Sequence, residues 1–112
     1  MMMAYVSNVT TENFKDFLKT GEIVMIDISA NWCAPCKVLS PIIDTIAAEF
    51  TNEGIDVKIG KMDVDDNRDI AVDYSVTSIP TILIFKNGEL VDRNTGMIQK
   101  KALRLLVEKH IV

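Results

Sequence analysis

Apolar residues along the chain fall into two patterns, short continuous runs and stripes spaced at helical intervals. The runs are rich in β-branched residues and are bounded by turn residues, which is typical of buried strands. They predict strands over residues 23–28, 55–63 and 81–85. The stripes recur every three or four residues, and the longest predicts an amphipathic helix over about 35–50. Pro41 lies inside this helix and predicts a kink, because proline removes one backbone hydrogen bond.

Shorter patterns predict the remaining elements. Residues 5–9 are expected to form a short edge strand, and a stripe from Phe14 to Leu18 predicts a short helix. Two further helices are expected, one over about 68–74 and the last over 100–110.

The C-terminal third contains a clear hairpin pattern. Asn87-Gly88 separates the apolar run from a returning strand over 90–95, and Gly96 ends that strand. Asn-Gly between two strand patterns is the strongest short-range indication of a β-hairpin. Strands that alternate with helices, followed by a hairpin and a helix, predict an α/β fold. We expect a central mixed β-sheet of about five strands, flanked by four helices on both faces.

Length, composition and charge fit this picture and exclude several classes of protein. The chain has 112 residues, of which 48% are hydrophobic and 25% charged, so we expect one globular domain over 1–112. The net charge is −4 and no basic cluster extends beyond Lys100, Lys101 and Arg104, so nucleic-acid binding is not expected. No stretch reaches the roughly 18 apolar residues of a membrane span, and the N-terminus lacks the pattern of a signal peptide. We therefore expect a cytoplasmic monomer that does not bind membranes.

The candidate chemistry is a pair of cysteines between the strand over 23–28 and the long helix. Cys33 and Cys36 are the only cysteines of the chain. We expect Cys33 at the exposed mouth of the helix, where unpaired N–H groups and the helix dipole favour a thiolate. Cys36 lies on the same helical face, with its Cα within the roughly 4.4–6.8 Å that a disulfide requires. Pro35 suits the first helical turn. This arrangement predicts a redox-active dithiol.

Alternative readings of these polar residues are weaker. A zinc site needs about four ligands, and besides the two cysteines the chain offers only His110 and carboxylates. A purely structural disulfide of this spacing would close too small a loop to stabilise the fold much. Asp63, Asp65 and Asp66 suggest calcium, but they lack the glycine and terminal glutamate of an EF-hand loop. We therefore expect no metal site.

Residues 32–37, Trp-Cys-Ala-Pro-Cys-Lys, follow an apolar strand that contains Asp27. This arrangement resembles the thioredoxin family, and the order of predicted elements matches the thioredoxin fold along essentially the whole chain. The resemblance implies a thiol–disulfide oxidoreductase that acts as a general protein-disulfide reductase. It implies that Cys33 attacks the substrate disulfide and Cys36 resolves the mixed disulfide. It also implies no bound cofactor, only the redox-active Cys33–Cys36 disulfide, and a partner, an NADPH-dependent flavoprotein thioredoxin reductase that returns the electrons.

Asp27 is the second candidate catalytic residue. Its apolar neighbours predict a covered strand, where desolvation should raise the pKa of the carboxyl group. A hydrogen-bonded core aspartate without a catalytic role is the alternative. The resemblance implies that the acid lies behind Cys36 and relays its proton. Lys61 matches the lysine that accompanies this acid in the family, although the residues alone indicate only a solvated strand lysine.

A substrate-docking surface is the third expectation. The resemblance implies a cis peptide at Ile79-Pro80 beside the cysteines, which would leave the Ile79 backbone free to pair with an extended substrate. Trp32 next to Cys33 is expected at the surface, with ordinary core packing as the alternative. The expected apolar patch consists of seven residues: Trp32, Ala34, Pro35, Ile79, Pro80, Gly96 and Met97.

Two residues depart from the commonest thioredoxin pattern. Ala34 replaces a glycine and favours helix by up to about 1 kcal/mol, which would stiffen the active-site turn and change its redox potential. Ser29 replaces a frequent aromatic residue, which leaves the packing beside Asp27 open. Two other functions stay open: an oxidant or isomerase of the same family, and a binding subunit or chaperone in which the redox chemistry is incidental.

Overall fold

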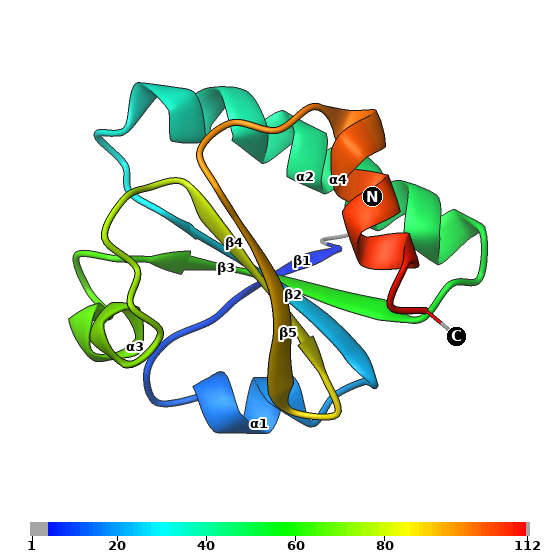
Figure 1. Ribbon diagram of the computed structural model, residues 1–112, viewed down its shortest axis with the longest axis horizontal. Coiled ribbons are helices and arrows are strands. Elements are labelled where there is room, and N and C mark those ends of the chain that lie inside the picture. Colours follow the sequence, from blue (N-terminus) through cyan, green and yellow to red (C-terminus); the bar gives the residue numbers. More distant parts are fainter. Residues whose placement is uncertain (1–4, 112) are drawn as a thin grey trace.

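The computed structural model describes residues 5–111, which form a five-stranded sheet covered by helices (Figure 1). The element boundaries lie within two residues of those that the sequence predicts. In chain order the elements are β1 (Val6–Asn8), α1 (Phe14–Leu18), β2 (Ile23–Ser29), α2 (Ala34–Asn52), β3 (Val57–Asp63), α3 (Arg68–Asp73), β4 (Thr81–Lys86), β5 (Glu89–Thr95) and α4 (Lys100–Glu108).

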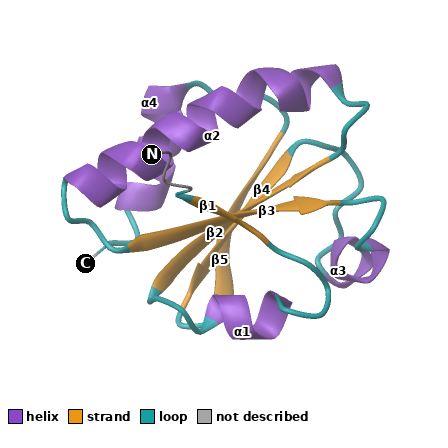
Figure 2. Ribbon diagram, turned by 180° about the vertical axis from the view of Figure 1, so that it is seen from behind, coloured by secondary structure: helices purple, strands orange, loops and turns teal. Residues whose placement is uncertain are grey.

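The sheet is mixed, with the strand order β1-β3-β2-β4-β5. The strands β1, β3 and β2 run parallel to one another, whereas β4 is antiparallel to β2 and β5 is antiparallel to β4. The helices α2 and α4 cover one face, while α1 and α3 lie on the other (Figure 2). The predicted fold class is therefore confirmed, including the short edge strand β1 and the C-terminal hairpin.

Two apolar cores, one on each face of the sheet, hold the helices in place. Successive side chains of a strand point to opposite faces, so Ile23 and Met25 of β2 face α2 and α4, whereas Val24 and Ile26 face α1 and α3. All four side chains are buried. This two-sided burial explains why β2 is a continuous apolar run in the sequence. Asp27 interrupts that run on the α2 side.

The β4–β5 turn confirms the hairpin prediction. Asn87 has a φ angle of 53° and Gly88 one of 84°, the positive values that a two-residue hairpin turn of the expected type requires. Asparagine and glycine tolerate this region of backbone conformation better than other residues.

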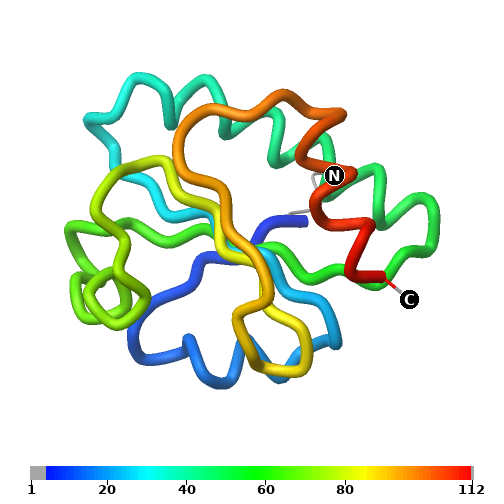
Figure 3. The backbone as a smooth tube through the Cα atoms, in the orientation of Figure 1, coloured from blue at the N-terminus to red at the C-terminus, as the bar shows by residue number. Residues whose placement is uncertain are grey.

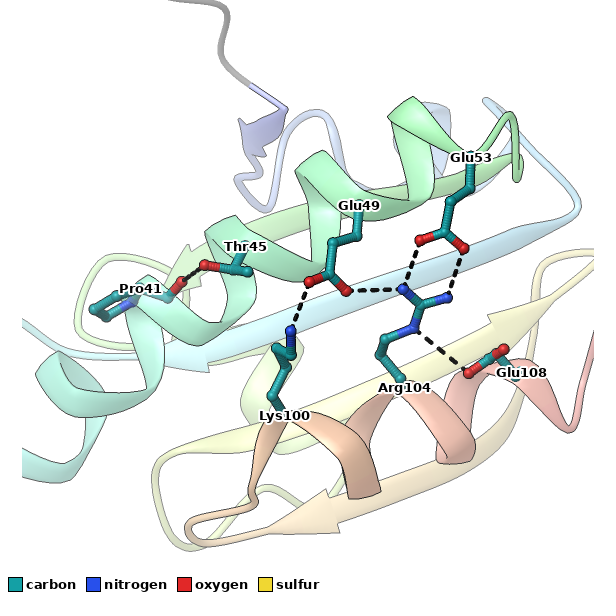
Figure 4. A network of polar contacts seen from close by, with 7 residues as sticks. All are labelled: Pro41, Thr45, Glu49, Glu53, Lys100, Arg104 and Glu108. Carbon is teal, nitrogen blue, oxygen red and sulfur yellow. Dashed lines mark hydrogen bonds and ion pairs between the residues drawn. The ribbon is translucent and has the colours of Figure 1, made fainter.

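An ion-pair network joins α2 to α4 (Figure 4). Arg104 of α4 donates to Glu49 of α2 and to Glu53, the C-cap residue of α2, at 2.8 Å each, and Lys100 contacts Glu49 at 2.6 Å. The Arg104 guanidinium also lies 4.6 Å from the ring centroid of Phe50. Together these contacts fix α4 against the C-terminal half of α2. The N-terminal end of α2, which carries the cysteines, lies outside the network.

Within α2, the Thr45 hydroxyl donates to the Pro41 carbonyl at 2.9 Å. Pro41 lies inside the helix as expected, and the kink stays a prediction. Between residues 5 and 111, no helix combines the length and apolar character that a membrane crossing demands.

Candidate active site

The two cysteines lie where β2 leads into α2. Cys33 is the N-cap residue of α2, and the backbone N–H of Cys36 donates to Cys33 Sγ at 3.2 Å. The two residues form a disulfide with their Cα atoms 5.3 Å apart, as the spacing predicts. Pro35 lies in the first turn of the helix. In the reduced protein this N–H and the positive end of the helix dipole favour a thiolate at Cys33.

The predicted exposure of Cys33 was wrong. Cys33 is only 5% exposed and Cys36 is 4% exposed, so exposure does not distinguish the two residues. The reason is tertiary packing: Val64 and Ile79, from two distant loops, lie against the cysteine pair. Neighbouring Trp32 is 69% exposed, as expected for a surface residue.

Asp27 of β2 is buried on the α2 side of the sheet, as predicted. Its residue exposure is 4%, and burial raises the pKa of its carboxyl group to about 6. The positive charge of Lys61 opposes this shift, whereas the negative charge of Asp44 adds to it. Within residues 5–111, no group donates a hydrogen bond to Asp27 Oδ1. At this oxygen Asp27 therefore lacks the hydrogen bond expected of a core aspartate without a catalytic role.

Lys61 lies directly beside Asp27, as its register partner on β3. The side chain is exposed, which agrees with the solvated strand lysine that the residues alone indicate. Its positive charge favours the ionised form of Asp27.

A cavity of about 270 Å³ connects Asp27 with Cys36, and we call it the Asp27 cavity. It lies between the start of α2 and strands β1, β2 and β3. Its lining residues are Asn8, Asp27, Ser29, Ala30, Asn31, Cys36, Lys37, Ser40, Lys61 and Asp63. The structure thus brings together three of the four predicted catalytic residues, while the fourth, Cys33, is disulfide-bonded to Cys36.

A second hollow, the docking groove, is lined by six residues: Trp32, Val64, Val76, Thr77, Ser78 and Ile79. The peptide bond between Ile79 and Pro80 is cis, as the resemblance implies. Pro80 itself is buried, so its expected place in an exposed patch was wrong. Pro80 directly precedes β4, which lies inside the sheet between β2 and β5.

The loop before α2, the loop before β4 and the turn after β5 meet at this end of the sheet, as the backbone trace shows (Figure 3). The Gly96 N–H donates to the Pro80 carbonyl at 2.8 Å, which fixes the turn after β5 beside the loop before β4. Gly96 has a φ of 91°, a conformation that favours glycine. Met97 is 47% exposed, and Ala34 and Pro35 are also exposed, as expected for a patch around the cysteines.

One contact of the site lies outside the sequence-based predictions. The Trp32 Nε1–H donates to Asp65 Oδ2 at 2.8 Å, and the Asp65 backbone N–H donates to Asp63 Oδ1 at 2.8 Å. The acidic loop after β3 therefore orients the indole ring of Trp32. No local pattern predicts a contact between residues so far apart in the chain.

Comparison of the chain with known protein families shows that the family model for thioredoxin matches residues 5–109. The chain belongs to the thioredoxin family. The thioredoxin of Chlamydia caviae is 43% identical over 102 residues, which cover 91% of this chain and 95% of the relative. The thioredoxin of Rickettsia felis is 43% identical over 106 residues, covering 94% and 98%.

Solved thioredoxin structures show the same fold. A mutant thioredoxin from Halobacterium salinarum superposes with a TM-score of 0.84 at 29% identity, covering 98% of this chain and 95% of the other. The oxidised mitochondrial thioredoxin 3 of Saccharomyces cerevisiae gives a TM-score of 0.83 at 29% identity, covering 96% and 99%. As a member of the thioredoxin family with an intact cysteine pair, the protein is a thiol–disulfide oxidoreductase whose redox group is its own disulfide.

Proposed function

We propose that this protein reduces protein disulfides by two successive exchanges, with Cys33 as the attacking residue and Cys36 as the resolving residue. The observation that carries this assignment is the Asp27 cavity, which Cys36 and Asp27 line together. A resolving thiol must lose its proton before it can attack, so it needs a nearby base. Cys33 instead occupies the helix N-cap, where the helix terminus itself favours the thiolate.

In the first step, the Cys33 thiolate attacks one sulfur of the substrate disulfide. A bond forms between Cys33 and that sulfur, and the other substrate sulfur leaves as a thiolate that takes a proton from solvent. Substrate and enzyme are then joined by a mixed disulfide.

In the second step, Asp27 accepts the proton of the Cys36 thiol. The Cys36 thiolate attacks Cys33, the Cys33–Cys36 disulfide forms, and the second substrate sulfur leaves as a thiolate that is then protonated. Two electrons have passed from the cysteine pair to the substrate. The raised pKa of Asp27, about 6, suits a base that must both accept and release a proton near neutral pH. We assign Lys61 the role of keeping that pKa from rising further.

The docking groove supports the choice of protein substrates. Ile79 lies against the cysteine pair, and the exposed Trp32 and Met97 flank it with apolar surface. An extended peptide can pair with the Ile79 backbone as an added strand, so binding would depend little on substrate sequence. Ala34 and Pro35 complete this surface beside Cys33.

We further propose a cytoplasmic protein of one domain that acts as a monomer and carries electrons in cellular redox homeostasis. An NADPH-dependent flavoprotein thioredoxin reductase would restore the dithiol after each cycle. The single sheet shared by both apolar cores supports the one-domain proposal.

The test of these roles is a trapping experiment with the two cysteine variants. Cys36→Ser should accumulate mixed disulfides with protein substrates, because the second step is blocked. The matched variant Cys33→Ser should accumulate few, since Cys36 lines the Asp27 cavity, which shares no lining residue with the docking groove. Equal trapping by the two variants would contradict the assignment of attacking and resolving residues.

A further inference from the structure

Asn67 is a buried polar residue at the end of the acidic loop, where helix α3 begins. It is 5% exposed and occupies the N-cap position of α3. An asparagine at this position usually accepts a hydrogen bond from an N–H group of its own helix. Within the part of the chain that the structure describes, the Asn67 side chain makes no such bond to α3. Its donor and acceptor are used elsewhere.

The Asn67 side chain joins two segments that lie far apart in the chain. Its Oδ1 accepts hydrogen bonds from the backbone N–H of Thr11 at 2.8 Å and from the Thr11 hydroxyl at 3.2 Å. Its Nδ2 donates to the backbone carbonyl of Asp63 at 2.8 Å. The turn before α1 is thereby tied to the start of the acidic loop. A buried amide that loses a partner costs free energy, so these bonds hold the loop in one geometry.

The acidic loop contributes to the docking groove in two ways. Val64 lines the groove and packs against the cysteine pair. Asp65 accepts the hydrogen bond of the Trp32 indole, and the Asp63 side chain in turn accepts one from the Asp65 backbone N–H. A series of hydrogen bonds therefore runs from Asn67 through Asp63 and Asp65 to the indole ring.

We propose that Asn67 is a positioning residue for protein substrates, because it fixes the acidic loop so that Asp65 holds Trp32 at the docking groove. The inference rests on the proposed function, in which protein disulfides bind at this groove. Asn67 does not line the groove and acts on it through the loop. Trp32 is 69% exposed, so packing restrains its ring little and the bond to Asp65 orients it. Loss of Asn67 should therefore weaken substrate docking and leave the attack of Cys33 on a small disulfide unchanged.

The first test separates docking from chemistry by steady-state kinetics, with a small dithiol as the reductant. Asn67→Ala should raise the KM for disulfide-bonded insulin about fivefold, the factor that one ordinary hydrogen bond represents. The kcat value, and the rate with a small aromatic disulfide, should stay at the wild-type level. Urea unfolding of each variant measures any loss of stability separately from KM.

Asn13→Ala is the matched control. Asn13 is the N-cap residue of α1, and its side chain accepts from the Thr10 N–H at 2.8 Å and donates to the Asn8 carbonyl at 3.3 Å. It makes the same two kinds of hydrogen bond beside the same turn, but neither bond reaches the acidic loop. Its KM should equal that of wild type. A rise in KM as large as that of Asn67→Ala would show a general effect of this turn and overturn the proposal.

A double-mutant cycle tests whether Asn67 acts through Asp65. Asp65→Ala alone removes the hydrogen bond to Trp32, so the addition of Asn67→Ala should raise KM no further. Two effects that simply add would show that the residues act independently, which contradicts the proposal.

A spectroscopic test does not depend on catalysis. Trp32 is the only tryptophan of the chain, so its indole N–H gives a single NMR signal. Exchange of this hydrogen with water should be faster in Asn67→Ala than in wild type, and should approach the rate in Asp65→Ala. Asn67→Asp keeps the acceptor for Thr11 and loses the donor to the Asp63 carbonyl. It should also speed up the exchange, which keeps the test valid if Asn67→Ala fails to fold.

A wild-type KM in Asn67→Ala, or an indole exchange rate that neither Asn67 variant changes, would overturn the proposal. An equal loss of kcat with protein and small disulfides would also overturn it, because it would show general damage to the site. A wild-type protein that does not reduce insulin, while its indole exchange still responds to Asn67→Ala, would instead refute the proposed function and leave the positioning of Trp32 standing.

Discussion

Replacing Asp27 by alanine is expected to stabilise the folded protein at neutral pH. Burial raises the pKa of this carboxyl from 3.8 to about 6, so above that range folding must bury a charge. The pKa difference corresponds to about 3 kcal/mol of folding free energy, since each pKa unit is worth about 1.4 kcal/mol. Removal of the carboxyl group leaves a small cavity, which costs about 1 kcal/mol. The net expected gain is therefore about 2 kcal/mol.

The pH dependence identifies the cause of that gain. Between pH 3.8 and about 6 the folded protein binds more protons at Asp27 than the unfolded chain, so wild-type stability falls as pH rises through this window. Below it both states are protonated and the advantage of Asp27→Ala disappears. Above it the advantage is complete. Burial of the ionised Asp27 carboxyl group therefore lowers the free energy of unfolding above this pH window.

Urea unfolding of the oxidised wild type and Asp27→Ala, repeated from pH 3.5 to pH 8, measures this difference directly. Asp66→Ala, at an exposed position of the acidic loop, is the matched control and should change stability by less than about 0.5 kcal/mol. A variant that is less stable than wild type at pH 7, or a gain that is the same at every pH, would refute the reasoning.

Three further predictions concern contacts away from Asp27. Arg104→Ala should lower the urea midpoint of unfolding at low salt, and the difference from wild type should shrink in 1 M salt, because screening weakens the ion pairs of α2 and α4. Asp65→Ala should raise the KM for protein disulfides and leave the rate with small disulfides unchanged, since only docking needs an oriented Trp32; a matching loss with both substrates would contradict this. Gly60→Ala should destabilise the protein by about 1–3 kcal/mol, because the new Cβ would lie 2.4 Å from Val9 Cγ2. A urea midpoint equal to that of wild type would contradict this prediction.

Local patterns were sufficient to predict the elements. The run over β2, the Asn87-Gly88 turn and the stripe of α2 each reflect a regular period or a turn conformation that nearby residues determine. The placement of Cys33 before a helix also follows from neighbours in the chain. These features therefore agree with the structure within two residues.

Features that depend on distant segments were not predictable in the same way. The burial of Cys33 depends on Ile79, and the orientation of Trp32 depends on Asp65. Neither partner is specified by spacing along the chain. The Asp27 cavity likewise is lined by residues of three separate strands and of α2, which no local pattern brings together. The resemblance to thioredoxins supplied the cis peptide before Pro80, which the residues alone favour only weakly.

The reduction of a protein disulfide by a small dithiol, catalysed by wild type or by Cys33→Ser, tests the central claim most directly. Wild type should accelerate the reaction, because Cys33 is the residue that attacks the substrate. Cys33→Ser should leave only the uncatalysed rate, although its fold and docking groove remain. Equal rates with the two proteins would contradict the proposed mechanism.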